Sequence, residues 1–248
     1  MKIVLRIFIA LIVLLGIAAG GFVIWGSSAL PPMPEAIAAL TSDSQVSVKT
    51  APWLVFAPAS GTAKAGYILY PGARVDPRAY APAARAIAAK GYLVVIPPMP
   101  LNFAIFGVNK ADEIIAAHPE ITLWAVGGHS LGGAMAASYA KKNLSKVKGI
   151  IFLASYPASS DDLSKSNLKV SSIFGTLDGL ATGAKIDASR PLLPADTAWV
   201  AIEGGDHAQF GWYGPQQGDN PATISRPAQT DQIVTAAVNL LASLGGAQ

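Results

Sequence analysis

The chain has 248 residues, which is enough for one large α/β domain with a substantial core but too few for two such domains. Its net charge is +3, and because Lys2 and Arg6 stand at its start, the remainder carries only about +1, which excludes the basic surface of a nucleic-acid-binding protein. There is no cysteine, which excludes disulfides, thiol nucleophiles and cysteine metal sites.

An uncharged apolar stretch of 19 residues, Ile7 to Trp25, follows the two cations. As a helix it would rise about 28 Å, close to the hydrocarbon thickness of a bilayer. Trp25 stands where an interfacial aromatic residue belongs, and Pro31, Pro32 and Pro34 then end the helix and begin a stiff linker. The stretch has no polar face, which a helix packed on the core of a soluble domain would present to solvent.

Two interpretations of this stretch remain, an uncleaved membrane anchor and a cleaved signal peptide. Under both of them the domain is exported. An uncleaved anchor fits the length and the tryptophan better than a cleaved signal peptide, whose apolar core is usually roughly 7–15 residues, although Ser27-Ser28-Ala29 would serve as a cleavage site. Both cations precede the stretch and Gly26 to Val48 carries none, so the positive-inside rule keeps the N-terminus in the cytoplasm. We therefore predict a single-pass membrane protein with its domain on the extracytoplasmic side, or a secreted domain if the segment is cleaved.

We divide the chain into an anchor (residues 1–28), a linker (29–44) and a domain (45–248). Within the domain, short apolar runs alternate with helical stretches. The predicted strands are Val46–Thr50, Trp53–Ala57, Tyr67–Tyr70, Tyr92–Ile96, Ile121–Val126, Gly149–Ala154, Val170–Gly175 and Thr197–Glu203. The predicted helices are Pro77–Lys90, Val108–Ala117, Leu131–Asn143 and Ala228–Leu244.

The strands are apolar throughout rather than alternating, and they alternate with helices. This arrangement indicates a mostly parallel sheet covered by helices on both faces. Only 15 residues separate the strand ending at Ala154 from the strand beginning at Val170. That is too few for an inserted helical cap, so we expect an open active site.

The most informative motif is Gly128-His129-Ser130-Leu131-Gly132, between a predicted strand and a predicted helix. A G-x-S-x-G sequence in this context is typical of a nucleophile elbow, a sharp turn that exposes the serine hydroxyl above the sheet. Glycine is needed on either side because a Cβ there would block the close approach of strand and helix. Ser130 is therefore the candidate nucleophile.

The candidate base is chosen from only three histidines. His129 adjoins the nucleophile, and its side chain should point away from Ser130. His118 lies in a predicted surface turn. His207 lies in a glycine-containing loop directly after the last strand, where it would face the elbow, so we predict that it is the base.

The acid that orients the base is expected between Ser130 and His207 in the chain. Asp178 follows a strand in Gly175-Thr176-Leu177-Asp178-Gly179, and a carboxylate just past a strand end would reach the histidine loop. Asp206 is adjacent to the histidine, but successive side chains diverge, so it would orient the ring poorly. We predict a Ser130–His207–Asp178 triad.

The oxyanion is expected to meet two backbone amides. One is Leu131, directly after the nucleophile, and we choose Ala73 in the loop Tyr70-Pro71-Gly72-Ala73-Arg74 as the other. Arg74 is expected to be a solvated loop residue, with a substrate carboxylate as an alternative partner. Phe210 and Trp212 follow the base and are candidate pocket walls, although they would equally well pack their own loop onto the domain.

Residues 66–244 resemble the α/β-hydrolase superfamily, in particular the compact, lidless serine hydrolases related to dienelactone hydrolases and small bacterial carboxylesterases. The segments that carry the resemblance are Tyr70-Pro71-Gly72, Gly128-His129-Ser130-Leu131-Gly132-Gly133, Gly175-Thr176-Leu177-Asp178-Gly179 and Gly205-Asp206-His207. The resemblance implies an eight-stranded sheet, a Ser-Asp-His triad and no cofactor. Two departures are that dienelactone hydrolases use a cysteine nucleophile, and that Pro71-Gly72 replaces the usual His-Gly of the oxyanion loop.

We expect a serine hydrolase that cleaves a small-molecule carboxylic ester through an acyl-enzyme, without a metal ion or other cofactor. Thioesters, lipids and peptides are alternative substrates, and the oligomeric state is open. An alternative from a different functional class is a non-catalytic binding or signalling protein of the cell envelope that has the hydrolase fold. Three scattered histidines and the absence of an H-E-x-x-H motif argue against metal catalysis.

Overall fold

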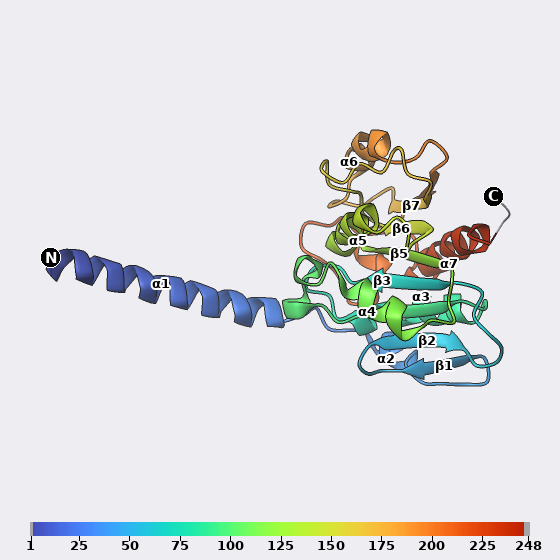
Figure 1. Ribbon diagram of the computed structural model, residues 1–248, viewed down its shortest axis with the longest axis horizontal. Helices are drawn as coiled ribbons and strands as arrows, with labels where there is room; N and C mark the ends of the chain where they lie inside the picture. The colour runs from blue at the N-terminus through green and yellow to red at the C-terminus, as the bar shows by residue number, and fades with distance from the viewer. Residues whose placement is uncertain (1, 246–248) are drawn as a thin grey trace.

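The computed structural model describes residues 2–245, in which a single long helix projects from a domain built on one sheet (Figure 1). The sheet has eight strands in the order β1-β2-β4-β3-β5-β6-β7-β8. Strands β1, β2 and β4 pair antiparallel, and all other neighbours pair parallel, which confirms the predicted mostly parallel sheet. The strands are β1 (Val46–Lys49), β2 (Leu54–Pro58), β3 (Gly66–Tyr70), β4 (Leu93–Ile96), β5 (Trp124–His129), β6 (Gly149–Leu153), β7 (Lys169–Gly175) and β8 (Ala198–Ile202).

Helices cover both faces of this sheet because its central strands are apolar on both sides. Every residue of β3, β4, β5 and β6 is buried. One face packs against α3 (Ala81–Ala88) and α7 (Arg226–Ser243), and the other against α4 (Lys110–Ala117) and α5 (Leu131–Lys142). No helix lies between β6 and β7, in agreement with the predicted lack of a cap, and α6 (Gly183–Ser189) follows β7.

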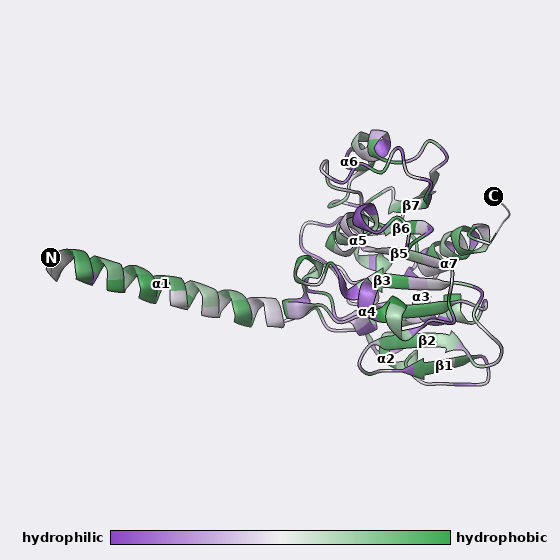
Figure 2. Ribbon diagram, viewed as in Figure 1, coloured by the Kyte–Doolittle hydropathy of each residue, from purple (hydrophilic) through white to green (hydrophobic). Residues whose placement is uncertain are grey.

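The first helix, α1 (Lys2–Ser27), stands outside the domain. Its segment Val4–Ser27 is long and apolar enough to cross a membrane, and residues 4–25 are all exposed. Figure 2 shows the hydrophobic colour along most of the helix, with paler turns toward the domain, whereas hydrophobic and hydrophilic colours are mixed along the ribbon of the domain. At about 1.5 Å per residue these 24 residues span about 36 Å, slightly more than a bilayer's hydrocarbon core.

The segment predicted as a linker contains a short helix, α2 (Pro34–Ala38), that packs on the domain. Ala36 is fully buried, and Met33 donates its amide proton to the carbonyl of Trp212 (2.8 Å). Upstream, Leu30 forms a parallel bridge with Val75 in the loop after β3. The prolines therefore end α1 as expected, and the chain beyond them follows the surface of the domain.

The remaining differences from the sequence prediction concern short or irregular elements. The helix predicted from Pro77 begins as a 3₁₀ turn (Pro77–Tyr80) before α3, and α6 was not predicted because seven residues give too little periodicity. Other 3₁₀ turns are Pro100–Asn102, Ala104–Phe106, Arg190–Leu192 and Ala208–Phe210. The loops that follow β3, β4, β5, β6, β7 and β8 meet at the carboxyl edge of the sheet, where the candidate site lies.

Candidate active site

Ser130 occupies the sharp turn between β5 and α5. Its backbone lies in the left-handed half of conformational space (φ 52°, ψ −124°), which a residue with a Cβ adopts only when the surrounding structure enforces it. A Cβ on Gly128 or Gly132 would lie 2.4 Å or 2.1 Å from the carbonyl oxygen of Tyr70, so only glycine allows this approach. The hydroxyl of Ser155, just after β6, donates to the carbonyl oxygen of Ser130 (2.6 Å) and holds the turn from the other side.

The structure brings Asp178 and His207 together. Oδ2 of Asp178 lies 2.8 Å from Nδ1 of His207, and the two side chains are almost completely buried. The other carboxylate oxygen, Oδ1, accepts the amide protons of Leu180 and Ala181, each at 2.7 Å. A carboxylate only accepts, so Nδ1 carries the proton and Nε2 presents its lone pair.

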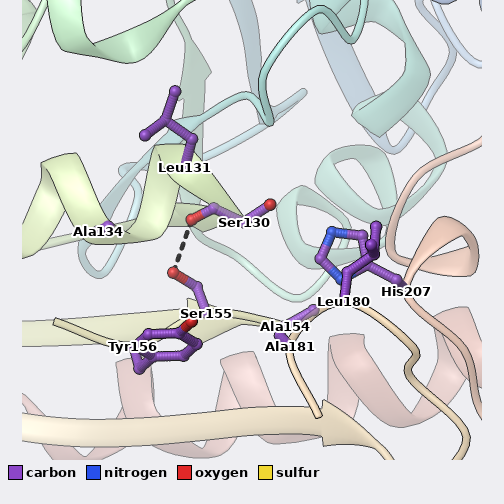
Figure 3. A pocket seen from close by; sticks show the side chains of 9 residues that line it. All are labelled: Ser130, Leu131, Ala134, Ala154, Ser155, Tyr156, Leu180, Ala181 and His207. Atoms are coloured by element: carbon purple, nitrogen blue, oxygen red, sulfur yellow. Dashed lines mark hydrogen bonds between the residues drawn. The ribbon is translucent and has the colours of Figure 1, made fainter. Parts of the chain in front are cut away.

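Ser130 and His207 line the same cavity, which has a volume of about 280 Å³ (Figure 3). The Ser130 hydroxyl is directed toward the imidazole in Figure 3. No hydrogen bond joins the two groups within residues 2–245, and Nε2 of His207 is buried without a partner. Ligand-free hydrolases often have a long contact here that tightens when substrate binds. The other residues that line the cavity are Leu131, Ala134, Ala154, Ser155, Tyr156, Leu180 and Ala181.

The two amides predicted to meet the oxyanion, those of Leu131 and Ala73, have no hydrogen-bond partner among the described residues. In the loop after β3, the amides on either side of Ala73 both have hydrogen-bond partners. Gly72 donates to the hydroxyl of Tyr80 (2.9 Å) and Arg74 donates to the carbonyl of Asn102 (2.8 Å). Ala73 therefore has the one unpaired amide among these three successive residues, as an oxyanion donor would require.

His129 does not act on Ser130 but packs behind His207. Its ring is fully buried, lies 4.5 Å from the His207 ring, and hydrogen-bonds through Nδ1 to the hydroxyl of Tyr80 (2.9 Å). Burial, and then the neighbouring His207, lower the pKa of His129 well below its ordinary value. It stays neutral and adds no second positive charge beside the base. The third histidine, His118, pairs with Glu120 near the surface (3.0 Å).

Two residues that the sequence did not indicate hold the catalytic loops in place. Gln229 of α7 is completely buried, and its side-chain amide accepts from the Asp206 amide (3.1 Å) and donates to the Asp206 carbonyl (2.8 Å). Asp219 accepts the amide protons of Ala208 (2.8 Å) and Gly179 (3.0 Å), so it joins the base loop to the acid loop. The segment after His207 therefore holds the loops of His207 and Asp178 next to each other.

For Phe210 and Trp212 the structure agrees with the second of the two alternatives, and Arg74 differs from expectation. Phe210 and Trp212 do not line the cavity beside Ser130. The Phe210 ring is buried and stacks on His129 (6.0 Å between centroids), while Trp212 Nε1 donates to Thr230 Oγ1 (3.1 Å), so both fasten their loop to the domain. Arg74 is not a freely solvated side chain, because its guanidinium lies 4.3 Å from the centre of the Trp25 ring.

The neighbouring acid, Asp206, does not contact the base. Its Oδ1 accepts the amide proton of Gln209 (2.8 Å), and burial raises the pKa of this carboxyl. Within residues 2–245 no cluster of three or more His, Asp or Glu side chains is arranged to hold a metal ion.

Comparisons with known proteins agree with this architecture. Residues 66–231 match the alpha/beta hydrolase family. The structure is similar to a predicted CIB-like hydrolase from Thermoplasma acidophilum (TM-score 0.59, 16% identity, 81% of this chain and 98% of that chain). It is also similar to the esterase domain of a Rhodothermus marinus protein (TM-score 0.56, 13% identity, 76% and 91%). None of the curated proteins matches the sequence.

Proposed function

The chain belongs to the alpha/beta hydrolase family, and on this premise we propose that it is a membrane-tethered serine hydrolase that cleaves carboxylic esters. The observation that carries the proposal is the buried pair Asp178–His207, because His207 lines the same cavity as Ser130 and its Nε2 has no partner among the described residues. The name of the esterase domain in the similar structure points to the same chemistry.

In the acylation step, Ser130 Oγ attacks the ester carbonyl carbon while His207 Nε2 takes the hydroxyl proton. The carbonyl oxygen becomes an oxyanion, which the amides of Leu131 and Ala73 stabilise. Collapse of this intermediate breaks the ester bond, and His207 returns the proton to the leaving alcohol. Asp178 holds the imidazole in the required tautomer and stabilises the transient imidazolium.

Deacylation repeats these steps with water as the nucleophile. His207 takes a proton from the water, the acyl-enzyme bond breaks, and the proton returns to Ser130. No metal ion or cofactor enters the scheme. The volume of the cavity, about 280 Å³, lies at the small end of the range for ligand pockets, which favours a small acyl group beside Ser130.

The tether in this proposal is α1, with the domain on the extracytoplasmic side. Its support is the length and hydropathy of Val4–Ser27 together with the position of the charges that precede it.

The test is labelling of the full chain with a fluorophosphonate, which modifies only an activated serine. We expect the wild type to be labelled and Ser130→Ala not to be. Ser155→Ala, which removes a hydroxyl from the same cavity, should still be labelled, because Ser155 bonds the elbow backbone and is not the nucleophile. A folded wild-type chain that takes no label, and hydrolyses no chromogenic ester in a chain-length series, would refute the enzyme and leave a binding protein with this fold.

A further inference from the structure

Helix α1 meets the domain at the carboxyl edge of the sheet, the edge that carries the candidate active site. Leu30 bridges to Val75 in the loop after β3, and the Asn102 side-chain amide, in the loop after β4, donates to the carbonyl of Gly26 (2.9 Å). In Figure 1 the helix leaves the domain on one side, while α7 ends on the opposite side. The direction in which α1 projects is therefore the direction that the catalytic edge faces.

Aromatic side chains join the end of α1 to the loop after β4. The ring of Phe103 stacks on Phe22 (6.0 Å between centroids) and lies 5.5 Å from Trp25. Phe106 contacts both Phe22 (6.4 Å) and Phe103 (6.3 Å) edge-on. These contacts reach back along the helix to Phe22, so the loop lies alongside its last turns and not only at its end.

The same loop carries exposed apolar side chains. Outside α1, the large hydrophobic side chains that are exposed within the described part of the chain are Ile37, Ile105, Phe106 and Leu144. Two of the four are adjacent in this loop, where Ile105 is 55% and Phe106 is 52% exposed. Single exposed hydrophobics are ordinary, but a pair beside an apolar helix forms a continuous apolar surface.

The depth of this surface follows from the helix geometry. Phe22 lies five residues before the helix end at Ser27, or about 7.5 Å along the axis. The polar headgroup layer is itself about 5–7.5 Å thick on each side of the bilayer. If Ser27 lies at the outer limit of the headgroups, Phe22 and the Phe106 ring against it lie at the boundary of the hydrocarbon.

We propose that Ile105 and Phe106, together with Phe22 and Trp25, form a bilayer-docking surface that holds the catalytic edge against the membrane, and that the enzyme takes amphipathic esters from that membrane. The occupant is the bilayer because the surface continues the membrane-spanning face of α1 without a break, and a second copy would have to displace the lipid that surrounds that helix. The proposal rests on the proposed tether, and its substrate part rests on the proposed ester hydrolysis.

The docking surface is tested by depth measurement in phosphatidylcholine vesicles that hold the full chain. Because the chain has no cysteine, Ile105→Cys and Leu144→Cys each give one labelling site for a nitroxide. Leu144 is a matched control, since it is 46% exposed and follows α5 at the opposite edge of the sheet. We expect the label at residue 105 to be relaxed by oxygen and shielded from a water-soluble nickel chelate, and the label at residue 144 to behave in the reverse way. Equal accessibility at the two positions would overturn the docking surface, while failure of the chain to float with the vesicles would overturn the tether and the surface together.

The substrate class is tested with Ile105→Asp and Leu144→Asp, neither of which touches the triad. We expect Ile105→Asp to lower hydrolysis, in vesicles, of the acetate of a fluorogenic alcohol that carries a long alkyl chain by about tenfold. Hydrolysis of a water-soluble acetate should stay within about twofold, because a carboxylate at this depth opposes docking but leaves the acyl site unchanged. Leu144→Asp should change neither rate. Equal losses on both substrates would overturn the membrane source of the ester. A chain that hydrolyses neither ester but still shows the buried label at residue 105 would contradict the hydrolase and support the docking surface.

Discussion

Replacing Asp178 with asparagine provides a strict test of the triad, because the surrounding amides dictate how the new side chain lies. In the wild type, Oδ1 accepts from Leu180 and Ala181 while Oδ2 faces His207 Nδ1. Asparagine has one acceptor oxygen, and turning it away would leave two amide protons without a partner, at a cost of about 1–3 kcal/mol each. The oxygen therefore stays with the amides, and the NH₂ group faces His207.

This orientation reverses the tautomer of the base. An NH₂ group donates to Nδ1, so the imidazole proton moves to Nε2, which then has no lone pair to accept the proton of Ser130. The side chain loses no hydrogen bond and the fold is retained. In a Ser-His-Asp triad this change costs on the order of 10⁴-fold in kcat, or about 5.4 kcal/mol of transition-state stabilisation at 1.36 kcal/mol per decade.

The assay is steady-state hydrolysis of a water-soluble chromogenic acetate by the full chain in detergent, with circular dichroism as the check on folding. The matched control is Asp206→Asn, which removes the neighbouring carboxylate but keeps an acceptor for Gln209, and should retain activity within about threefold. Retention of more than about a tenth of the wild-type kcat by Asp178→Asn would contradict the assigned role. A large loss in Asp206→Asn alone would transfer the role of the acid to Asp206.

Three further predictions concern groups around the site. Burial holds the pKa of the Asp206 carboxyl above its unfolded value of 3.8, so ionisation of this group destabilises the native wild type as pH rises from 3.8 through the folded pKa. The difference in Tm between Asp206→Asn and the wild type should therefore shift in favour of the variant between about pH 3.5 and about pH 7. The same difference at both pH values would contradict the raised pKa. Gln229→Leu leaves a buried amide and a buried carbonyl unpaired and should lower stability by at least about 2 kcal/mol, a fall of roughly 4–8 °C in Tm, whereas Gln232→Leu on the exposed side of the same helix should not. Tyr80→Phe removes the acceptor for an oxyanion-loop amide and should lower both kcat and thermal stability, whereas Tyr67→Phe, which removes a buried hydroxyl without a partner among the described residues, should lower neither.

The parts of the molecule that the sequence predicted are those encoded locally. Central strands of a parallel sheet are buried on both faces, so they read as continuous apolar runs such as those of β3 and β6. The turn at Ser130 is likewise encoded by its own glycines. The pairing of Asp178 with His207 could be predicted because the fold brings the carboxyl ends of its parallel strands to one edge, and because the chain offers few candidate histidines and aspartates for these roles.

The supporting residues that the sequence did not predict bond to groups that only the tertiary fold brings close to them. Gln229 bonds the backbone of residue 206, and Tyr80 bonds an amide eight residues away and the ring of His129. The sequence pattern around a glutamine or tyrosine in a helix does not reveal such a hydrogen-bond partner, because only the tertiary fold brings the side chain and its partner together. The sequence left two alternatives open for Phe210 and Trp212, for a related reason. Their position after β8 was right, but the sequence does not determine whether a side chain turns toward the cavity or toward the domain.

Arg74 links the tether to the chemistry, and this link has a measurable consequence. Its backbone is left-handed (φ 56°), which costs about 1–2 kcal/mol for a residue with a Cβ. The guanidinium compensates by donating twice to the carbonyl of Ser28 (2.8 and 3.1 Å) and by stacking on Trp25, contacts that together contribute about 2 kcal/mol at a partly exposed site. In Arg74→Ala the strain remains and the compensation is lost.

The loop that carries the amide of Ala73 should therefore leave its strained conformation most of the time in Arg74→Ala. Because that amide is proposed to act on the oxyanion and not on the bound ester, we expect kcat to fall by about tenfold while KM changes by less than about twofold. The control is Arg78→Ala in the same loop, where the exposed guanidinium pairs with Asp76 alone among the described residues, so that its loss should have no effect on kcat. Equal kcat values in the two variants would show that the junction does not position the loop. A loss confined to Arg74→Ala would mean that the contact with α1 sets the geometry of the oxyanion donor, so that releasing the domain from its helix changes its catalysis as well as its location.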